Sequence, residues 1–153
     1  MKKTYIIAFL FFFIDLISKQ IVTHLIKLNE SIKVIKNFFY LTYTQNTGAA
    51  WSILKDQRIL LLILSVIVLF IINKYMNKEK LNKLENFSYG MIIGGILGNF
   101  FDRLVYGHVI DFLDFYIFGY NYPIFNLADS FIVIGIILLI ISYIRKEKYE
   151  RSN

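Results

Sequence analysis

The sequence contains no cysteine, so disulfides, thiolate nucleophiles and cysteine-ligated metal sites are all excluded. Histidine is scarce as well, because His24 and His108 are the two that occur. A metal site would therefore have to consist almost entirely of carboxylates, and we expect neither a metal nor another cofactor. Proline occurs once, at Pro123. Charged residues are missing from several long stretches, and these stretches decide the fold class.

Hydrophobic residues make up 57% of the chain, whereas ordinary globular domains contain about 45–50%. The excess lies in long uncharged runs, which is typical of membrane-spanning helices of roughly 20 residues. Pro123 falls at the start of the last run, where a missing N–H does no harm. The sequence predicts an all-α membrane protein in which residues 1–153 form a single domain, a bundle of four transmembrane helices. The predicted spans are about Tyr5–Leu25, Arg58–Met76, Phe87–Val105 and Ile124–Ile144.

The basic residues predict the orientation of these spans. The net charge of +6 could suggest a nucleic-acid partner, but Lys and Arg cluster beside the apolar runs, where anionic lipid head groups attract them. We therefore expect membrane lipid, and no nucleic acid, as the partner. The positive-inside rule places both termini in the cytoplasm. Two segments then face outward, Ile26–Gln57 and Tyr106–Pro123. The charges on the expected inner side include Lys2, Lys3, Lys74, Lys78, Lys80, Lys83, Arg145, Lys146, Lys148 and Arg151.

The outer segments contain more than linkers. Residues Ser31–Thr44 are rich in β-branched and aromatic side chains, a pattern that predicts a strand or hairpin. The stretch Asn46–Trp51 is typical of a tight turn, here leading into a helix at the membrane interface. The aromatic residues of the second outer segment also favour the interface. In the third span, Gly90, Gly94 and Gly98 recur every four residues, which predicts close packing of another helix on that face.

Acidic residues near lipid are candidates for function because they are costly to place there. Asp15 and Lys19 are four residues apart on one helix, so they can pair, and a positioning role is the simpler interpretation. At the end of the third span, Asn99 shares a helical face with Asp102 and Arg103. We expect the adjacent cation and a bundle partner to hold Asp102 ionised, which favours structure or substrate orientation over proton transfer.

Asp111 and Asp129 have no cation near them in sequence. Asn126 lies on the same predicted helical face as Asp129 and can orient its carboxylate. Two buried carboxylates that meet can share one proton, and peptide hydrolysis without a metal or nucleophile needs such a pair. By helical rise, Asp129 lies about 8 Å below Pro123, close to the outer interface.

Two other classes of function fit the topology. A small four-helix transporter would need an acid exposed at mid-helix with access from both sides, and Asp15, which has Lys19 beside it, is the only candidate. An assembly factor would explain the helices but not two unpaired acids at one depth. Peptidase activity of the purified protein would distinguish these hypotheses from a peptidase.

The sequence resembles the lipoprotein signal peptidase family, signal peptidase II. The resemblance covers nearly the whole chain and rests on five motifs in order. These motifs are Asp15-x-x-x-Lys19, Asn46-Thr47-Gly48-Ala49-Ala50-Trp51, the stretch Gly94–Arg103 ending in Asn99-Phe100-Phe101-Asp102-Arg103, Val109-Ile110-Asp111-Phe112, and Phe125-Asn126-Leu127-Ala128-Asp129-Ser130.

The resemblance implies an aspartic endopeptidase of the bacterial cytoplasmic membrane with its active site at the extracytoplasmic face. Such enzymes remove signal peptides from prolipoproteins, cutting before a cysteine that carries diacylglyceryl, and globomycin-type inhibitors occupy the substrate path. It implies that Asp111 and Asp129 are catalytic, and that Phe38–Tyr43 belongs to a β-cradle on the membrane surface. The residues implied to line or support the site are Asp15, Lys19, Asn46, Gly48, Asn99, Asp102, Arg103 and Asn126.

Overall fold

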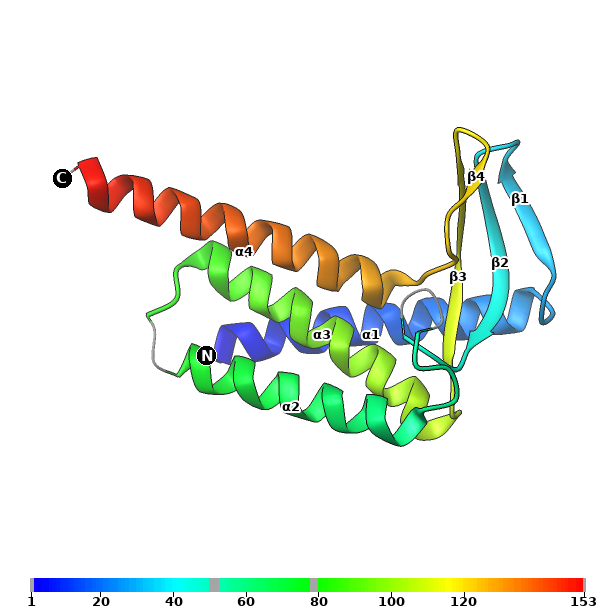
Figure 1. The fold of residues 1–153 in the computed structure, drawn as a ribbon, viewed down its shortest axis with the longest axis horizontal. Coiled ribbons are helices and arrows are strands. Elements are labelled where there is room, and N and C mark those ends of the chain that lie inside the picture. The colour runs from blue at the N-terminus through cyan, green and yellow to red at the C-terminus, as the bar shows by residue number, and fades with distance from the viewer. Residues whose placement is uncertain (1, 50–52, 78–79, 153) are drawn as a thin grey trace.

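The computed structural model describes residues 2–49, 53–77 and 80–152, and it combines a bundle of long helices with a small sheet. In Figure 1 the helices run roughly parallel to one another, and the strands cross one end of the bundle. Both chain termini lie at the opposite end. The elements in chain order are α1 (Lys2–Leu25), β1 (Ser31–Ile35), β2 (Phe39–Asn46), α2 (Arg58–Met76), α3 (Lys83–Val105), β3 (Val109–Ile117), β4 (Tyr120–Asn121) and α4 (Leu127–Ser152).

The predicted helices all exist, but three of them begin elsewhere, and α1 begins at Lys2 and not at Tyr5. The bounds of α2 agree with the prediction. Helix α3 begins four residues early because Asn82 and Glu85 form a capping box, in which each side chain accepts from the other's backbone N–H. Helix α4 begins at Leu127 and not at Ile124, so Pro123 precedes it. Asp129 is consequently the third residue of α4, so it lies closer to the N-terminal start of this helix than we predicted.

Three of the described helices, α1, α2 and α4, are long and apolar enough to cross a membrane. Helix α3 does not meet that criterion, which differs from the expected four apolar spans. The reason is its place in the bundle, where it packs extensively against α1 and α4. A helix enclosed by protein can carry polar residues such as Asn99 and Asp102, which would be too costly in contact with lipid.

The predicted glycine face of α3 packs against α1. A Cβ at Gly90 would lie 2.5 Å from the Ile7 side chain, and one at Gly94 would lie 2.6 Å from the Ala8 carbonyl oxygen. Neither position has room for a larger residue. The prediction of close helix packing is confirmed, and this packing aligns the polar ends of α1 and α3.

The sheet has the order β1-β2-β3-β4, and all neighbours are antiparallel. The predicted hairpin at Ser31–Thr44 is confirmed as β1 and β2. Strand β3 was not predicted, because Val109–Ile117 has no obvious alternation of apolar and polar residues. Phe112 of β3 packs against Val22 and Ile26, which fixes this strand over the end of α1.

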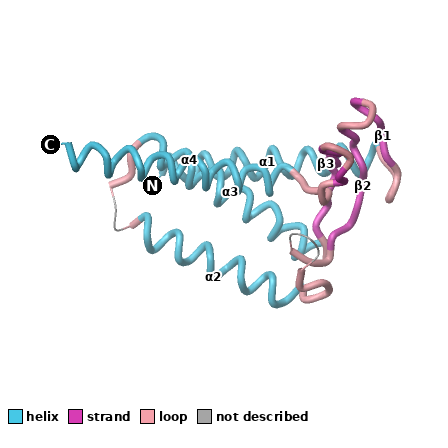
Figure 2. The backbone as a smooth tube through the Cα atoms, turned by 45° about the horizontal axis from the view of Figure 1, so that its top comes forward, coloured by secondary structure: helices cyan, strands magenta, loops and turns pink. Residues whose placement is uncertain are grey.

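The interfacial helix that we expected after Asn46 is not seen in the described part of this segment. Residues 50–52 of the expected region lie outside the described residues, and Ile53–Asp56 form a turn. Helix α2 packs against α3 and is set apart from α4 in Figures 1 and 2, while Tyr5 near the start of α1 donates to Asn73 near the end of α2.

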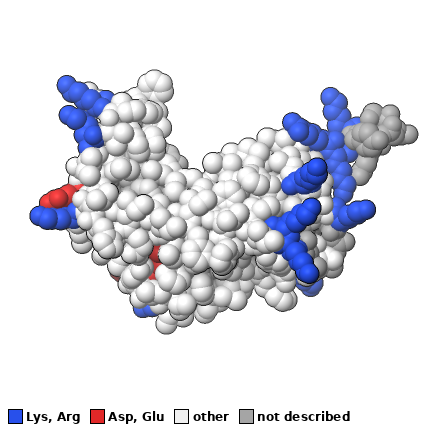
Figure 3. All heavy atoms as spheres, turned by 180° about the vertical axis from the view of Figure 1, so that it is seen from behind, with Lys and Arg blue, Asp and Glu red and all other residues white. Residues whose placement is uncertain are grey.

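Charged side chains gather at the two ends of the molecule. On the face that Figure 3 shows, a broad band without Lys or Arg separates a dense basic group near the C-terminal end from a smaller one near the sheet. Such a band is typical of a protein surface in contact with lipid.

Candidate active site

The two candidate acids come from different elements that meet where the sheet crosses the bundle. Asp111 is on β3 and is 3% exposed. Asp129 is in the first turn of α4 and is half-buried. They are brought together by Asn126, the residue before α4. Its side-chain Oδ1 accepts from the Asp129 N–H at 3.0 Å, and its backbone N–H donates to Asp129 Oδ2 at 3.3 Å.

Asn126 also reaches across to Asp111. Its Nδ2 donates to Asp111 Oδ1 at 2.7 Å, so one asparagine contacts both acids. Asn46 Nδ2 donates to Asp111 Oδ2 at 3.0 Å, and Asn99 Nδ2 donates to Asp129 Oδ1 at 2.7 Å. Each of the four carboxylate oxygens therefore accepts from an amide. Within the described chain, neither acid forms an ion pair.

The electrostatic surroundings favour protonation of Asp111. Burial, reinforced by the nearby Asp129, raises the pKa of the Asp111 carboxyl from its ordinary value of 3.8 to about 7. The amides of Asn46 and Asn126 oppose this rise but do not cancel it. At neutral pH the pair can therefore hold a proton that either gives to a substrate or receives from water.

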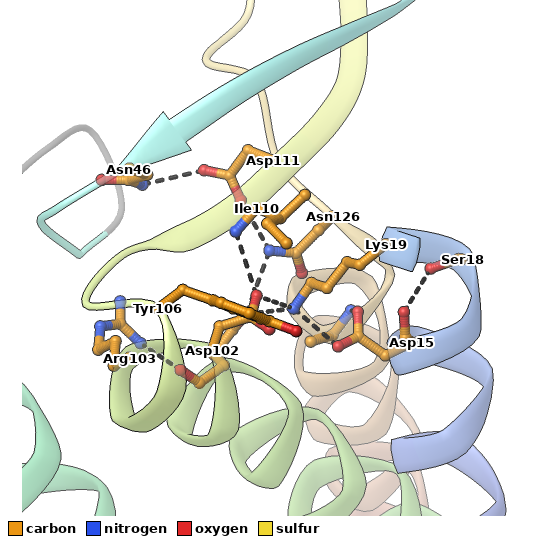
Figure 4. Close-up of polar contacts among 12 residues, drawn as sticks. Asp15, Ser18, Lys19, Asn46, Asp102, Arg103, Tyr106, Ile110, Asp111 and Asn126 are labelled. Carbon is orange, nitrogen blue, oxygen red and sulfur yellow. Dashed lines mark hydrogen bonds and ion pairs between the residues drawn. The ribbon is translucent and has the colours of Figure 1, made fainter. Parts of the chain in front are cut away.

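A second group of acids lies directly beneath the first. Lys19 Nζ lies 2.7 Å from Asp15 Oδ2 and 2.9 Å from Asp102 Oδ2, and all three side chains are almost completely buried. Figure 4 shows this ammonium between the two carboxylates. The predicted pairing of Asp15 with Lys19 is confirmed. The bundle partner that we expected for Asp102 is Lys19.

The ion-paired acids hold the backbone beside each candidate acid. Asp15 Oδ1 accepts from the Ala128 N–H at 2.9 Å, one residue before Asp129. Asp102 Oδ2 accepts from the Ile110 N–H at 3.1 Å, one residue before Asp111 (Figure 4). The lower group thus fixes the positions of the two peptides from which the upper pair extends.

Arg103 does not pair with Asp102, although we expected an adjacent cation to hold that acid. Its guanidinium donates from Nη2 to the Gly48 carbonyl at 2.7 Å and from Nη1 to the Asn99 carbonyl at 3.3 Å. The Gly48 N–H in turn donates to Asn46 Oδ1 at 2.9 Å. Arg103 therefore holds the end of β2, and with it the amide that contacts Asp111. The sequence could not show this, because Gly48 and Arg103 are far apart along the chain.

A cavity of about 780 Å³ opens at the two acids. Its polar floor is formed by Asn46, Asn99, Arg103, Asp111 and Asp129. Its remaining walls are mostly apolar and come from the turn before β2, from β3, from the segment before α4 and from α4 itself. The sequence did not identify these walls, because they depend on the alternation of side chains along the unpredicted β3. The apolar and aromatic lining residues include Phe38, Val109, Phe115, Ile117, Tyr122, Pro123, Ile124, Phe125, Ile132, Val133 and Ile134.

The geometry does not support a serine nucleophile with a histidine base, nor the acid that a transporter would need. The Ser130 hydroxyl donates to the Asn126 carbonyl at 3.0 Å, and His24 bonds within its own helix to Gln20. Burial lowers the pKa of His108, a half-exposed residue outside the cavity lining. Asp15, the acid that a transporter would need to be unpaired, is paired with Lys19.

Comparison with known proteins agrees with this arrangement. The family described as Signal peptidase (SPase) II matches residues 7–145. A bacterial membrane enzyme structure determined in meso at 2.3 Å is 35% identical, with a TM-score of 0.88 over 96% of this chain and 90% of that one. A second such structure, at 1.9 Å, is 36% identical, with a TM-score of 0.84 over 94% of this chain and 93% of that one. The protein therefore belongs to the signal peptidase II family, the prolipoprotein signal peptidases.

Proposed function

We propose that the protein is an aspartic endopeptidase in which Asp111 and Asp129 are the catalytic pair. The observation that carries the proposal is the set of hydrogen bonds that amide N–H groups donate to all four carboxylate oxygens. Amides orient both acids but leave them free to exchange protons, whereas an ion pair would fix the charge. The pKa of Asp111, raised to about 7, fits an acid that changes its protonation state during turnover.

The two acids divide the chemistry of hydrolysis. The ionised carboxylate takes a proton from a water molecule, and that water attacks the scissile carbonyl carbon. The protonated carboxyl gives its proton to the carbonyl oxygen, and a proton then passes to the leaving amine as the C–N bond breaks. The pair shares one proton, so the roles of base and acid belong to the pair and not to either residue.

The shape of the cavity supports a substrate anchored in the membrane. Its apolar walls continue along α4 through Ile132 and Val133, and α4 is one of the apolar spans. We propose that the diacylglyceryl group of a prolipoprotein lies against this wall and sets the peptide bond before the lipidated cysteine at the acids. A globomycin-type inhibitor would occupy the same cavity. Each buried CH₂ contributes about 0.8 kcal/mol to membrane attachment.

The remaining predicted residues act in this proposal by positioning. Asp15, Lys19 and Asp102 hold the two peptides, and Asn99 and Asn126 orient the carboxylates. Asn46, Gly48 and Arg103 form the connection at the end of β2.

We also propose that α3 crosses the bilayer as the fourth span, enclosed by the others, and that residues 1–153 form one peptidase domain. The dense basic group near the termini supports a cytoplasmic location for both of them (Figure 3). The active site would then face the extracytoplasmic side, at the opposite end of the bundle.

Cleavage of a diacylglyceryl-modified precursor by the purified protein tests the proposal. We expect a new N-terminus at the lipidated cysteine, and activity that persists in EDTA. The unlipidated form of the same precursor should be cut poorly, because it is not held at the depth of the acids. Loss of activity in EDTA, with recovery on adding zinc, would disprove the aspartic mechanism.

A further inference from the structure

A second depression lies on the face of the sheet opposite the catalytic pair. Side chains alternate along β3, so Asp111 and Phe115 line the active-site cavity, whereas Asp114 and Tyr116 line the other side. The depression has a volume of about 460 Å³. It is lined by Ser31, Asn37, Tyr40, Asp114, Tyr116 and Gly119.

Asp114 is an acid with an incomplete set of partners. It is 4% exposed, and its Oδ2 accepts from the Thr42 hydroxyl at 2.7 Å. Thr42 in turn bonds to Ser31 at 2.8 Å. Asp114 Oδ1 is buried and accepts no hydrogen bond within the described part of the chain, and no described cation pairs with Asp114. A buried carboxylate without a counter-charge is costly, so a cationic hydrogen-bond donor beside Oδ1 would stabilise Asp114.

The walls beside Asp114 suit a small organic cation. The Tyr40 and Tyr116 rings meet edge to face at 5.3 Å. Their hydroxyls already accept hydrogen bonds, Tyr40 from the Asn37 N–H at 3.2 Å and Tyr116 from Asn121 Nδ2 at 3.3 Å. The hydroxyls are thereby held in place, and the ring faces can contact a cation. An aromatic ring beside a carboxylate is favourable for an ammonium group.

We propose that this depression binds a primary ammonium group, which donates to Asp114 and lies against the two tyrosines. A Ca²⁺ ion fits less well, because it needs six to eight oxygen ligands and the depression offers one carboxylate. We assign the ammonium to the amino head group of a lipid, because the sheet crosses the end of the apolar bundle, and binding of a lysine of another polypeptide instead would overturn this assignment. Lys33, opposite Tyr40 in the strand register, forms no ion pair with Asp114, so no described lysine or arginine fills the site.

Protein-observed NMR of the purified protein in phosphatidylglycerol nanodiscs tests the proposal. Ethylammonium chloride is titrated at constant ionic strength, with n-propanol as a neutral probe of similar size. We expect saturable shifts of the Ser31, Thr42 and Asp114 amides with a Kd on the order of millimolar. The response to n-propanol should be at least about tenfold weaker, because it lacks the charge.

Variants then identify the group that binds. Asp114→Asn keeps an acceptor for Thr42 but removes the charge, and it should weaken ethylammonium binding at least about tenfold. Tyr40→Leu, which keeps Asp114, should weaken it by a smaller factor. Lys33→Ala should leave binding unchanged or tighten it. Absence of saturable shifts, unchanged binding in Asp114→Asn, or a preference for Ca²⁺ over ethylammonium would each overturn the proposal.

Two further arms distinguish the sources of the ammonium. Adding phosphatidylethanolamine to the nanodiscs should reproduce the shifts without ethylammonium if the ligand is a lipid head group. The peptide Gly-Lys-Gly, added in phosphatidylglycerol nanodiscs, should reproduce them if the ligand is a lysine side chain. None of these measurements uses peptidase activity, so their outcome is independent of the proposed catalytic pair.

Discussion

The same end of the bundle holds two groups of acids that differ in whether a cation or an amide contacts the carboxylates. Asp15 and Asp102 share the ammonium of Lys19, at 2.7 and 2.9 Å. Asp111 and Asp129 have amide partners and no ion pair among the described residues. The first arrangement stabilises the ionised form, whereas the second allows the proton to come and go. Counter-charge therefore separates the acids that position backbone from the acids that can perform chemistry.

The largest effect is expected at the proposed catalytic pair. We expect Asp111→Asn and Asp129→Asn each to lower the turnover of a lipidated precursor by at least about a thousandfold, because an amide cannot exchange the required proton. Both variants should still insert and unfold near the native temperature. Asp114→Asn is the matched control, since Asp114 lies on the same strand but on its other face, and it should cut at nearly the native rate. Turnover within tenfold of native in either catalytic variant would contradict the assignment.

Substitutions in the ion-paired group of Asp15, Lys19 and Asp102 should lower the stability of the protein. Lys19→Met leaves Asp15 and Asp102 without their counter-charge and should cost about 3–5 kcal/mol, seen as a lower Tm in detergent. The triple variant Asp15→Asn, Lys19→Met, Asp102→Asn keeps acceptors for the Ala128 and Ile110 N–H groups and removes all three charges. It should recover most of the lost stability. A native Tm for Lys19→Met alone would show that the ammonium is not needed to hold the fold.

The amide that contacts both acids should give a smaller effect on turnover. Asn126→Ala removes the donor to Asp111 and the cap of α4, so kcat should fall about tenfold to a hundredfold through loss of orientation. Loss of the cap should cost only about 1 kcal/mol of stability. Ser130→Ala, which removes a hydroxyl bonded to the Asn126 carbonyl, serves as the neighbouring control and should stay close to the native rate. Equal rates for both variants would indicate that the carboxylates are oriented without Asn126.

The sequence predicted the parts of this site that depend on local spacing. Asp15 and Lys19 are four residues apart on a helix, so their pairing follows from helical geometry. The start of α4 was misplaced because Pro123 is a common first helical residue, whereas the reciprocal bonds of Asn126 and Asp129 set the actual start.

Tertiary contacts, by contrast, could not be predicted. The partner of Arg103 is a carbonyl on a distant turn, and β3 carries Asp111 and Asp114 on opposite faces of a run that is buried along most of its length. The polar composition of α3 is permitted only because α1 and α4 enclose it. In each case the deciding neighbour is far away in the chain.

The two groups of acids should also differ in how pH affects the stability of the protein. The folded state holds the proton of Asp111 up to a pKa of about 7, whereas an unfolded chain releases it near the ordinary value of 3.8. Folding is therefore favoured by this group below about pH 4, and that contribution is lost as the pH rises through 7. Between these limits the Tm of the native protein should fall by on the order of ten degrees more than the Tm of Asp111→Asn, whose amide does not titrate. Scanning both proteins in the same detergent from pH 4 to 8 measures the difference directly. Parallel curves would mean that Asp111 does not hold a proton in the folded state, and the distinction between the two groups of acids would be lost.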